Sequence, residues 1–251
     1  MLNEDGSPFE PGRIVAMWSG PRNISTAMMR AWENRADTTV IDEPFYAHFL
    51  ARTGLDHPMR DEIVASGETD WRRVVERIVA VPEQGRIVYQ KHITTHWLEH
   101  LSTDWLGALD HVFLIREPEP VVASYAAKRG TPTPADLGYA QQAALFDHVA
   151  DELISGIPLV IDAARFLTDP AGQLRALCDG LDVPFDPAML AWPAGPRDSD
   201  GVWGAHWYDA VVRSTGFGPP RAPERAELDA AGRRVADVCR PYYEALARHA
   251  I

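Results

Sequence analysis

The sequence has few cysteines. Cys178 and Cys239 are its two cysteines among 251 residues, and neither belongs to a CxxC pair or to a Cys/His spacing suited to zinc. This usage is typical of a reducing interior. Disulfide staples are not needed either, because a chain of this length buries about 70 to 75% of the surface that its unfolded state exposes.

Long hydrophobic runs and a leader are also lacking. No apolar run approaches the ~18 to 20 residues of a membrane-spanning helix, and the start, MLNEDGSPFEPG, has neither a basic beginning nor an apolar core. These absences predict a cytoplasmic protein with no membrane partner, in which residues 1–12 form a flexible N-terminal segment.

Basic charge is scarce, since the formal net charge is -12. General binding to nucleic acid or to anionic membranes is not expected, because both require a basic face. A small anionic ligand stays open, since a local site can be basic in an acidic protein. The histidines are scattered without the spacing of a ligand set, so no metal site is expected.

Strand-like and helix-like segments alternate along the chain, without tandem repeats. Segments with helical spacing of apolar residues separate short runs rich in Val and Ile. This alternation indicates a single α/β domain over residues 1–251, with a central, mostly parallel sheet of about five strands and helices on both faces. The predicted strands are residues 13–18, 38–41, 86–90, 111–115 and 158–162.

Two further expectations concern the second half of the chain. Residues 193–221 are rich in Gly, Pro and Trp, which predicts a long loop of the kind that is often functional. The last helical segment carries an apolar stripe that includes Val238 and Tyr242, and Pro241 should kink or divide it.

The segment SGPRNIST, residues 19–26, leads from the first strand directly into a helix. Backbone N–H groups at a helix start, with hydroxyls beside them and the helix dipole behind, make an anion site. Against the phosphate-loop pattern GxxxxGK[ST], the segment has Gly20, four residues, then Ser25 and Thr26, but no second glycine and no lysine. A simpler interpretation is equally open, in which Asn23 or Ser25 only caps the helix.

The missing lysine bears on the chemistry. Kinases and ATPases use that lysine with magnesium to neutralise the charge of a transferring phosphoryl group. A sulfuryl group carries less charge, so its transfer can proceed with cationic side chains and backbone donors and without a metal.

The fourth strand supplies a second feature, in HVFLIREPEPVVASYAAK, residues 111–128. Arg116 stands at the end of the strand, and Ser124 lies about two turns along the following helix, where both could face one phosphate. Arg suits phosphate because its planar fork donates two parallel hydrogen bonds. The alternative is that Arg116 pairs with Glu117 or Glu119 on a solvated face.

Together the two features resemble the sulfotransferase family that uses 3′-phosphoadenosine 5′-phosphosulfate (PAPS) as donor. That family has a P-loop NTPase-like fold, and its loop of the form P-K-S-G-T-T binds the phosphosulfate. Its R-x-P-x-x-x-V-x-S-Y segment binds the 3′-phosphate, through residues that match Arg116 and Ser124. Residues 159–190 also look like the family's strand, acidic turn and helix start, so the resemblance covers roughly residues 13–190. The loop matches Pro21, Arg22, Asn23, Ile24, Ser25 and Thr26.

The resemblance has departures. Arg22 replaces the usual loop lysine, which keeps the positive charge but makes its role purely electrostatic. Ile24 replaces a glycine, so the backbone there must avoid positive φ. The family's frequent Trp is Ala27 here, and Trp71 or Trp203 would have to stack on the adenine instead.

In-line transfer to an acceptor also requires a base, and two strand ends offer one. Glu43, in IDEPFYAHF, matches a Glu-Pro context used by membrane-bound and bacterial members, although Pro44 makes helix capping an alternative role. His92 lies near the catalytic His of cytosolic members. Its neighbour Lys91 could stabilise the sulfuryl group or the leaving phosphate, as could Arg22.

The resemblance thus implies transfer of the sulfuryl group of PAPS to a hydroxyl or amine of a small-molecule acceptor. Trp192, Trp203 and Trp207 could line an aromatic or apolar acceptor pocket. Two other functions stay open: a nucleotide-dependent small-molecule kinase on the same scaffold, and a nucleotide-binding protein without catalysis.

Overall fold

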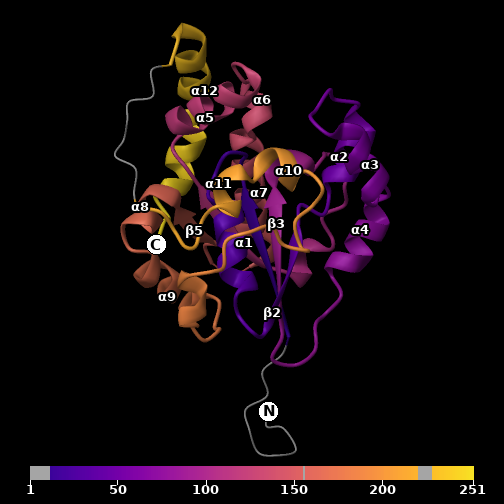
Figure 1. Cartoon of the computed structure of the whole chain (residues 1–251), viewed down its shortest axis with the longest axis vertical. Coiled ribbons are helices and arrows are strands. Elements are labelled where there is room, and N and C mark those ends of the chain that lie inside the picture. Colours follow the sequence, from indigo (N-terminus) through magenta and orange to yellow (C-terminus); the bar gives the residue numbers. More distant parts are fainter. Residues whose placement is uncertain (1–11, 155, 220–227) are drawn as a thin grey trace, which may run out of the picture.

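The computed structural model describes residues 12–154, 156–219 and 228–251, so the predicted N-terminal segment lies outside the described residues except for Gly12. Five parallel strands form one sheet, as predicted, and their order in the sheet is β2-β3-β1-β4-β5 (Figure 1). The strands are β1 (Arg13–Ser19), β2 (Thr38–Asp42), β3 (Ile87–Ile93), β4 (Asp110–Ile115) and β5 (Leu159–Asp162).

All five strands fall where the sequence predicts them, but β3 continues three residues beyond the predicted end at Gln90. Lys91 and His92 therefore lie inside the strand. Because side chains alternate along a strand, these two neighbours point to opposite faces of the sheet. Lys91 is paired in register with Met17 of β1 and Asp42 of β2, whereas His92 is paired with Trp18.

Each face of the sheet packs against its own helices. On the face of Val15 and Met17 lie α1 (Ser25–Glu33), α8 (Ala163–Thr168) and α9 (Pro170–Gly180), with the 3-10 helix η4 (Pro187–Leu190). On the face of Ala16 and Trp18 lie α4 (Trp71–Ile78), the 3-10 helix η2 (Leu106–Ala108), α7 (Tyr139–His148) and the π-helix η3 (Val149–Leu153). Helices on both faces of the sheet are the arrangement predicted for a buried parallel sheet.

Helix starts follow local sequence signals. The Asp162 carboxylate at the end of β5 accepts from the backbone N–H of Ala164 at 2.9 Å and so caps α8. Asp169 accepts from the N–H of Gly172 at 2.9 Å, and Pro170 takes the first position of α9. Both features are typical of helix N-termini.

The remaining helices surround the carboxyl edge of the sheet. Their bounds are α2 (Tyr46–Thr53), α3 (Arg60–Ser66), the 3-10 helix η1 (Thr94–His96), α5 (Pro118–Arg129), α6 (Pro134–Leu137), α10 (Gly204–Trp207), α11 (Asp209–Val212) and α12 (Ala230–Ala247).

Three expectations for the second half of the chain need correction. Within residues 193–221 the chain forms two short helices, α10 and α11. Pro241 does not divide the last helix, since α12 continues through it. Val238 and Tyr242 are exposed, whereas Ala236 and Cys239 are buried against α5 and α7, so the stripe is rotated from the predicted one.

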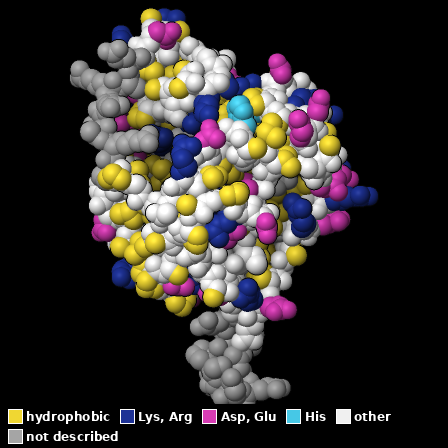
Figure 2. Space-filling view, in the orientation of Figure 1, with side chains coloured by type: hydrophobic (Ala, Val, Ile, Leu, Met, Phe, Trp, Pro, Cys, Tyr) yellow, Lys and Arg dark blue, Asp and Glu magenta, His cyan; other side chains and the backbone are white. Residues whose placement is uncertain are grey.

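The surface of the described residues carries both signs of charge. On the face drawn in Figure 2, acidic and basic side chains are interspersed with hydrophobic ones. Among the described residues, no helix combines the length and apolar character needed to cross a bilayer.

Candidate active site

The loop between β1 and α1 is held from below by side chains at neighbouring strand ends. Gln142 of α7 donates through Nε2 to the carbonyls of Trp18, at 3.0 Å, and Leu114, at 3.1 Å. Asn23 donates to the same Leu114 carbonyl at 3.0 Å. These bonds connect the carboxyl ends of β1 and β4, and they fix the path of the loop.

Asn23 and Ser25 do not cap α1 through their side chains. Asn23 accepts instead from the adjacent N–H of Ile24 at 2.8 Å, and Ser25 is the first helical residue. Ile24 has φ of −85°, so it tolerates the place of the family's glycine. The residue that takes positive φ is Arg22, at 58°. A non-glycine residue in this region stores strain, on the order of 1–3 kcal/mol, and such strain gathers at functional sites.

Arg22, Arg116 and Ser124 meet above this loop. The Nε of Arg22 donates to the Ser124 hydroxyl at 3.0 Å, and Arg116 donates through Nη1 to the Arg22 carbonyl at 2.7 Å. Burial lowers the pKa of Arg22, but a guanidinium stays charged at neutral pH. Because a guanidinium has five N–H donors, the bond to Ser124 leaves capacity to bind an anion.

The loop residue of this cluster, Arg22, lies three residues before the start of α1 at Ser25. The first N–H groups of a helix have no intrahelical partner, and the helix dipole is positive there. Two arginines and the Ser124 hydroxyl thus meet at the loop that leads into this helix start. Such a set can bind phosphate or sulfate oxygens without a metal.

A second cluster is buried at the ends of β2 and β3. Lys91 Nζ donates to Asp42 Oδ1 at 2.8 Å, to Glu43 Oε1, and to the Tyr208 hydroxyl at 2.6 Å. Tyr208 donates to Asp42 Oδ2 at 2.7 Å. Its hydroxyl lies 3.4 Å from Glu43 Oε1 and accepts from the indole N–H of Trp203 at 3.0 Å. All three ammonium hydrogens of Lys91 have partners here.

Burial sets the protonation properties of this cluster. It raises the pKa of Glu43 above the usual 4.5, with Lys91 opposing the rise and Asp42 adding to it. Burial alone would lower the pKa of Lys91, but the carboxylates of Asp42 and Glu43 outweigh it and raise that pKa. Burial likewise raises the pKa of Tyr208, so its phenol stays neutral. A carboxylate with a raised pKa is suited to accepting a proton near neutral pH.

The helix-capping alternative for Glu43 is wrong. The following helix, α2, begins at Tyr46, and its start has no side-chain cap, so Pro44 is not its first residue. Glu43 instead has φ of 41° and turns its carboxylate toward Lys91. Of the four non-glycine residues with positive φ in the described part of the chain, Arg22 and Glu43 belong to the two clusters, whereas Met59 and Asp182 lie elsewhere.

His92 lies on the other face of the sheet from Lys91. Its ring stacks on Trp18 with centroids 4.2 Å apart and is 3.0 Å from Gln90 Oε1. Burial lowers its pKa to about 3. His96 of η1, in contrast, has its Nδ1 3.8 Å from Glu43 Oε2 and stacks on Tyr46 and Phe49.

The segment of residues 200–212, which contains α10 and α11, connects the two clusters. Trp207 packs against the Arg22 guanidinium, with 5.8 Å from Cζ to the ring centroid. The next residue, Tyr208, belongs to the Lys91 cluster. At its start the segment is anchored by Asp200, which binds the buried Arg30 of α1 at 2.7 Å. The two clusters are therefore neighbours beneath one segment.

The three tryptophans proposed for an acceptor pocket separate into two groups. Trp203 and Trp207 lie in the apolar cluster of Tyr46, Leu50 and Tyr208, next to Glu43. Trp192 packs instead in the core cluster of Val15 and Met17, against Phe217, with ring centroids 5.0 Å apart. Trp71, one candidate for adenine stacking, is covered by the Arg72 guanidinium.

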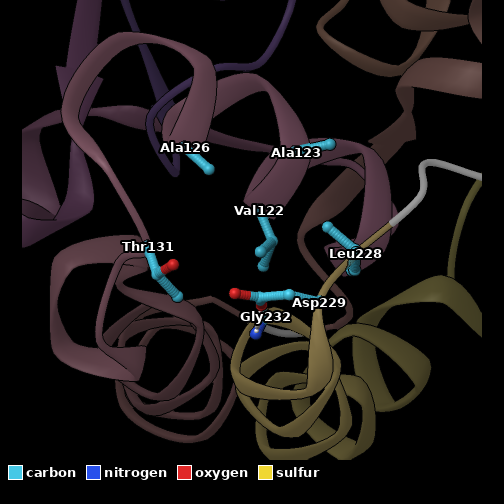
Figure 3. Close-up of a pocket in the computed structure, with 7 residues that line it drawn as sticks. All are labelled: Val122, Ala123, Ala126, Thr131, Leu228, Asp229 and Gly232. Carbon is cyan, nitrogen blue, oxygen red and sulfur yellow. Dashed lines mark hydrogen bonds between the residues drawn. The ribbon is translucent and has the colours of Figure 1, made fainter.

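A cavity of about 300 Å³ lies away from these clusters, between α5 and the start of α12. Figure 3 shows Val122 of α5 pointing toward Asp229 and Gly232 across it. The Asp229 carboxylate caps α12 by accepting from the N–H of Gly232 at 2.7 Å. The lining of this cavity contains none of the arginines or strand-end carboxylates of the two clusters, so we do not assign the reaction centre to the cavity.

Sequence analysis missed Tyr208, Asp42 and His96 as members of the site. Asp42 is adjacent to Glu43, and a buried strand ending in two acids was the signal available for it. Tyr208 is some 165 residues away from Glu43 along the chain. It was visible only as one aromatic residue in a loop rich in tryptophan.

Comparison with known proteins places this geometry in context. The model of the sulfotransferase domain family matches residues 13–250. Two curated Arabidopsis thaliana proteins, branched-chain-amino-acid aminotransferase-like proteins 1 and 2, are 37% and 35% identical to this chain over 208 residues, or 83% of it. That region spans 37% of the length of each relative.

Solved sulfotransferases share the fold. The sulfotransferase domain from the curacin biosynthetic pathway has a TM-score of 0.54 and 17% identity, covering 92% of this chain and 98% of that one. The domain from the olefin synthase of Synechococcus PCC 7002 has a TM-score of 0.57 and 14% identity, covering 95% and 98%. A mouse sulfotransferase complexed with PAP has a TM-score of 0.57 and 12% identity, covering 95% and 89%.

Proposed function

Because this chain belongs to the sulfotransferase domain family, we propose that it transfers the sulfuryl group of PAPS to a hydroxyl or amine of a small-molecule acceptor. The observation that carries the proposal is the hydrogen bond from Arg22 to Ser124. It joins the β1–α1 loop to α5, so that two motifs of the proposed donor site form one cationic surface. The complex of a mouse structural relative with PAP supports the choice of nucleotide.

The residues present fit a nucleotide that carries two separate anionic groups, the phosphosulfate and the 3′-phosphate. The loop residues and the start of α1 would bind the phosphosulfate, with Arg22 supplying positive charge. Arg116 and Ser124 would bind the 3′-phosphate, through the bidentate geometry that an arginine offers. The phosphosulfate set is Pro21, Arg22, Asn23, Ile24, Ser25 and Thr26.

In the transfer step, the acceptor oxygen or nitrogen forms a bond to sulfur as the bond from sulfur to the 5′-phosphate oxygen breaks. Glu43 accepts the acceptor's proton, because its buried carboxylate has a raised pKa and lies under the segment next to Arg22. Lys91 orients Glu43 and offsets part of the negative charge of Asp42 and Glu43. Arg22 and the amides of α1 stabilise the negative charge that develops on the leaving phosphate.

Glu43 is a better candidate for the base than His92. The His92 ring is buried between Trp18 and Phe45, on the face of the sheet away from Lys91. An imidazole with a pKa of about 3 also gives a conjugate acid too strong to form readily at neutral pH. We assign His92 a packing role and Glu43 the proton transfer.

The test compares the melting temperatures of the purified protein with adenosine 3′,5′-bisphosphate (PAP), with adenosine 5′-monophosphate, and with ATP plus magnesium. Of these three ligands, only PAP should raise the melting temperature clearly, since a ligand that binds only the folded state stabilises it by mass action. Arg116→Ala should abolish the rise, while Arg233→Ala, on the exposed side of α12, should retain it.

A rise with ATP and magnesium but none with PAP would instead establish the kinase reading. Transfer of labelled sulfate from PAPS to a panel of alcohols, phenols and amines is the second measurement. Tight PAP binding without transfer to any acceptor would indicate a nucleotide-binding protein without catalysis. A cytoplasmic location and the small-molecule nature of the acceptor belong to the same proposal.

A further inference from the structure

Tyr208 occupies an unusual place for an aromatic side chain. The whole residue is only 5% exposed, and its hydroxyl lies among one ammonium group and two carboxylates. It accepts a hydrogen bond from Lys91 Nζ at 2.6 Å, donates to Asp42 Oδ2 at 2.7 Å, and is 3.4 Å from Glu43 Oε1. An acceptor hydroxyl that loses its proton to Glu43 must come within about 2.6–3.2 Å of that carboxylate, where it would overlap the Tyr208 hydroxyl.

The residues on either side of Tyr208 are attached to the molecule more weakly. Neither α10 nor α11 contains a buried residue. The ion pair of Asp209 with Lys128, at 3.2 Å, has side chains that are 55% and 35% exposed, and exposed pairs contribute little. Trp203 and Tyr208 are therefore the principal inward contacts of this stretch.

Both ends of the same stretch are fixed more firmly. Asp200 binds the buried Arg30 at 2.7 Å, and its own carboxylate also accepts from the N–H of Arg197 at 2.9 Å. On the other side, Trp192 N–H donates to the Thr215 carbonyl at 3.1 Å. Residues 203–212 thus form a covering segment that is anchored at both ends and is held between them mainly by the side chains of Trp203 and Tyr208.

We propose that the Tyr208 hydroxyl occupies the position of the acceptor's hydroxyl against Glu43, so that the acceptor enters only when the covering segment withdraws Tyr208. This inference rests on the proposed function, because it assigns Glu43 as the base. Tyr208 is a gating residue: it satisfies Lys91 and the carboxylates while no acceptor is bound.

The energetics are consistent with an exchange of partners. Three buried charged groups cannot be left without hydrogen bonds, since a buried charge without a partner is strongly destabilising. An incoming hydroxyl replaces the bonds that Tyr208 gives up. Because Tyr208 is tethered, its effective concentration beside Glu43 is on the order of millimolar or above, so a dilute free acceptor must compete with it.

The first test replaces the hydroxyl alone. Tyr208→Phe leaves a space the size of a hydroxyl beside Glu43, which a water molecule can fill. In that variant, water attacks the sulfur of PAPS, the bond from sulfur to the 5′-phosphate oxygen breaks, Glu43 accepts the water proton, and sulfate and PAP leave. We expect PAP release from PAPS without added acceptor to rise about tenfold, the equivalent of one charge-assisted hydrogen bond.

The matched control is Tyr242→Phe, because Tyr242 is 40% exposed on α12 and should leave the rate unchanged. A residue that only supports the site would lower PAP release when changed. An unchanged or lower rate in Tyr208→Phe, with PAP still raising its melting temperature, would overturn the inference and leave the proposed function intact. Absence of PAP binding in the wild-type protein would instead overturn the proposed function itself.

A second test removes the whole side chain and adds it back as a free molecule. In Tyr208→Ala, p-cresol should raise the melting temperature more than toluene, which has the same ring but no hydroxyl. With labelled PAPS, sulfate should pass to p-cresol in Tyr208→Ala but not in Tyr208→Phe, where the ring still blocks the position. Binding of p-cresol without transfer, or equal transfer by the wild-type protein, would show that Tyr208 does not stand in for the acceptor.

Discussion

Arg22 and Glu43 hold left-handed backbone conformations, with φ of 58° and 41°, and each carries a charged side chain of the proposed site. Glycine would be the unstrained choice at both positions. At these two positions the strain directs a charged group inward from the end of a strand. Arg22 is turned toward Ser124, and Glu43 is turned toward Lys91.

Glu43→Gln should lower transfer of sulfate by about 10²–10⁴-fold, the range typical of a lost general base, with little change in PAP affinity. The pH profile gives a sharper test. Because burial raises the Glu43 pKa, the wild-type rate should fall on the acid side with a midpoint above 4.5, as the carboxylate becomes protonated. An identical acid limb in the Gln variant would assign the proton transfer to another group.

Arg22 permits a paired experiment on strain and charge. Arg22→Ala and Arg22→Gly both remove the guanidinium, and both should weaken PAP binding and turnover, because Arg22 also binds Ser124. At φ of 58°, glycine is unstrained whereas alanine is not. The free energy of unfolding of Arg22→Gly should therefore be about 1 kcal/mol higher than that of Arg22→Ala. Equal stabilities in urea unfolding would contradict a strained loop.

At the scale of elements, the sheet positions the site through the ends of its strands. Gln142 of α7 lies beneath the β1–α1 loop and bonds the carbonyls of Trp18 and Leu114. Gln142→Leu keeps the approximate volume but leaves two buried carbonyls with fewer partners. We expect a loss of about 1–3 kcal/mol in the free energy of unfolding, together with weaker PAP binding.

Gln141→Leu is the control, since Gln141 is the half-buried neighbour on the same helix. If both variants lose stability equally, the effect belongs to α7 as a whole. Only a selective effect of Gln142→Leu on PAP binding would connect α7 to the loop geometry.

The sequence permitted correct prediction of the five strands but not of the short helices α10 and α11, nor of the contacts between distant segments. The alternation of Val- and Ile-rich runs with helical spacing located all five strands, because burial of a parallel sheet requires it. The extension of β3 to Ile93 was missed because Lys91 and His92 are polar. The burial of Lys91 depends on Asp42 and Tyr208, and that of His92 depends on packing against Trp18. Hydrogen bonds between residues more than a hundred positions apart leave no local signal.

The last helix shows the same limit. Pro241 suggested a break, since proline removes a backbone donor and clashes with the preceding turn. The helix nevertheless continues, because its inner face packs against α5 and α7. Tertiary packing therefore outweighed the local preference.

At the scale of the molecule, buried histidines couple stability to pH. Burial lowers the pKa of His92 to about 3, and it also lowers the pKa values of His96 and His111. In the unfolded chain these groups titrate near 6.5. Their contribution to stability is therefore complete above pH 6.5 and is lost as the pH falls, because protons bind the unfolded chain more tightly.

Urea unfolding between pH 7 and pH 5 measures this coupling. His92 should add about 1.4 kcal/mol of lost stability per pH unit below 6.5, because its folded-state pKa lies far below this range. His92→Gln keeps a polar side chain beside Gln90 but cannot titrate, so its stability should decline less steeply by about that amount, even if its stability at pH 7 is lower. His249→Gln, at an exposed position near the C-terminus, is the control and should retain the wild-type slope. A His92→Gln slope equal to that of the wild-type protein would mean that His92 is not held neutral by burial. The packing role assigned to it against Trp18 would then have to be reconsidered, and with it the choice of Glu43 as the base.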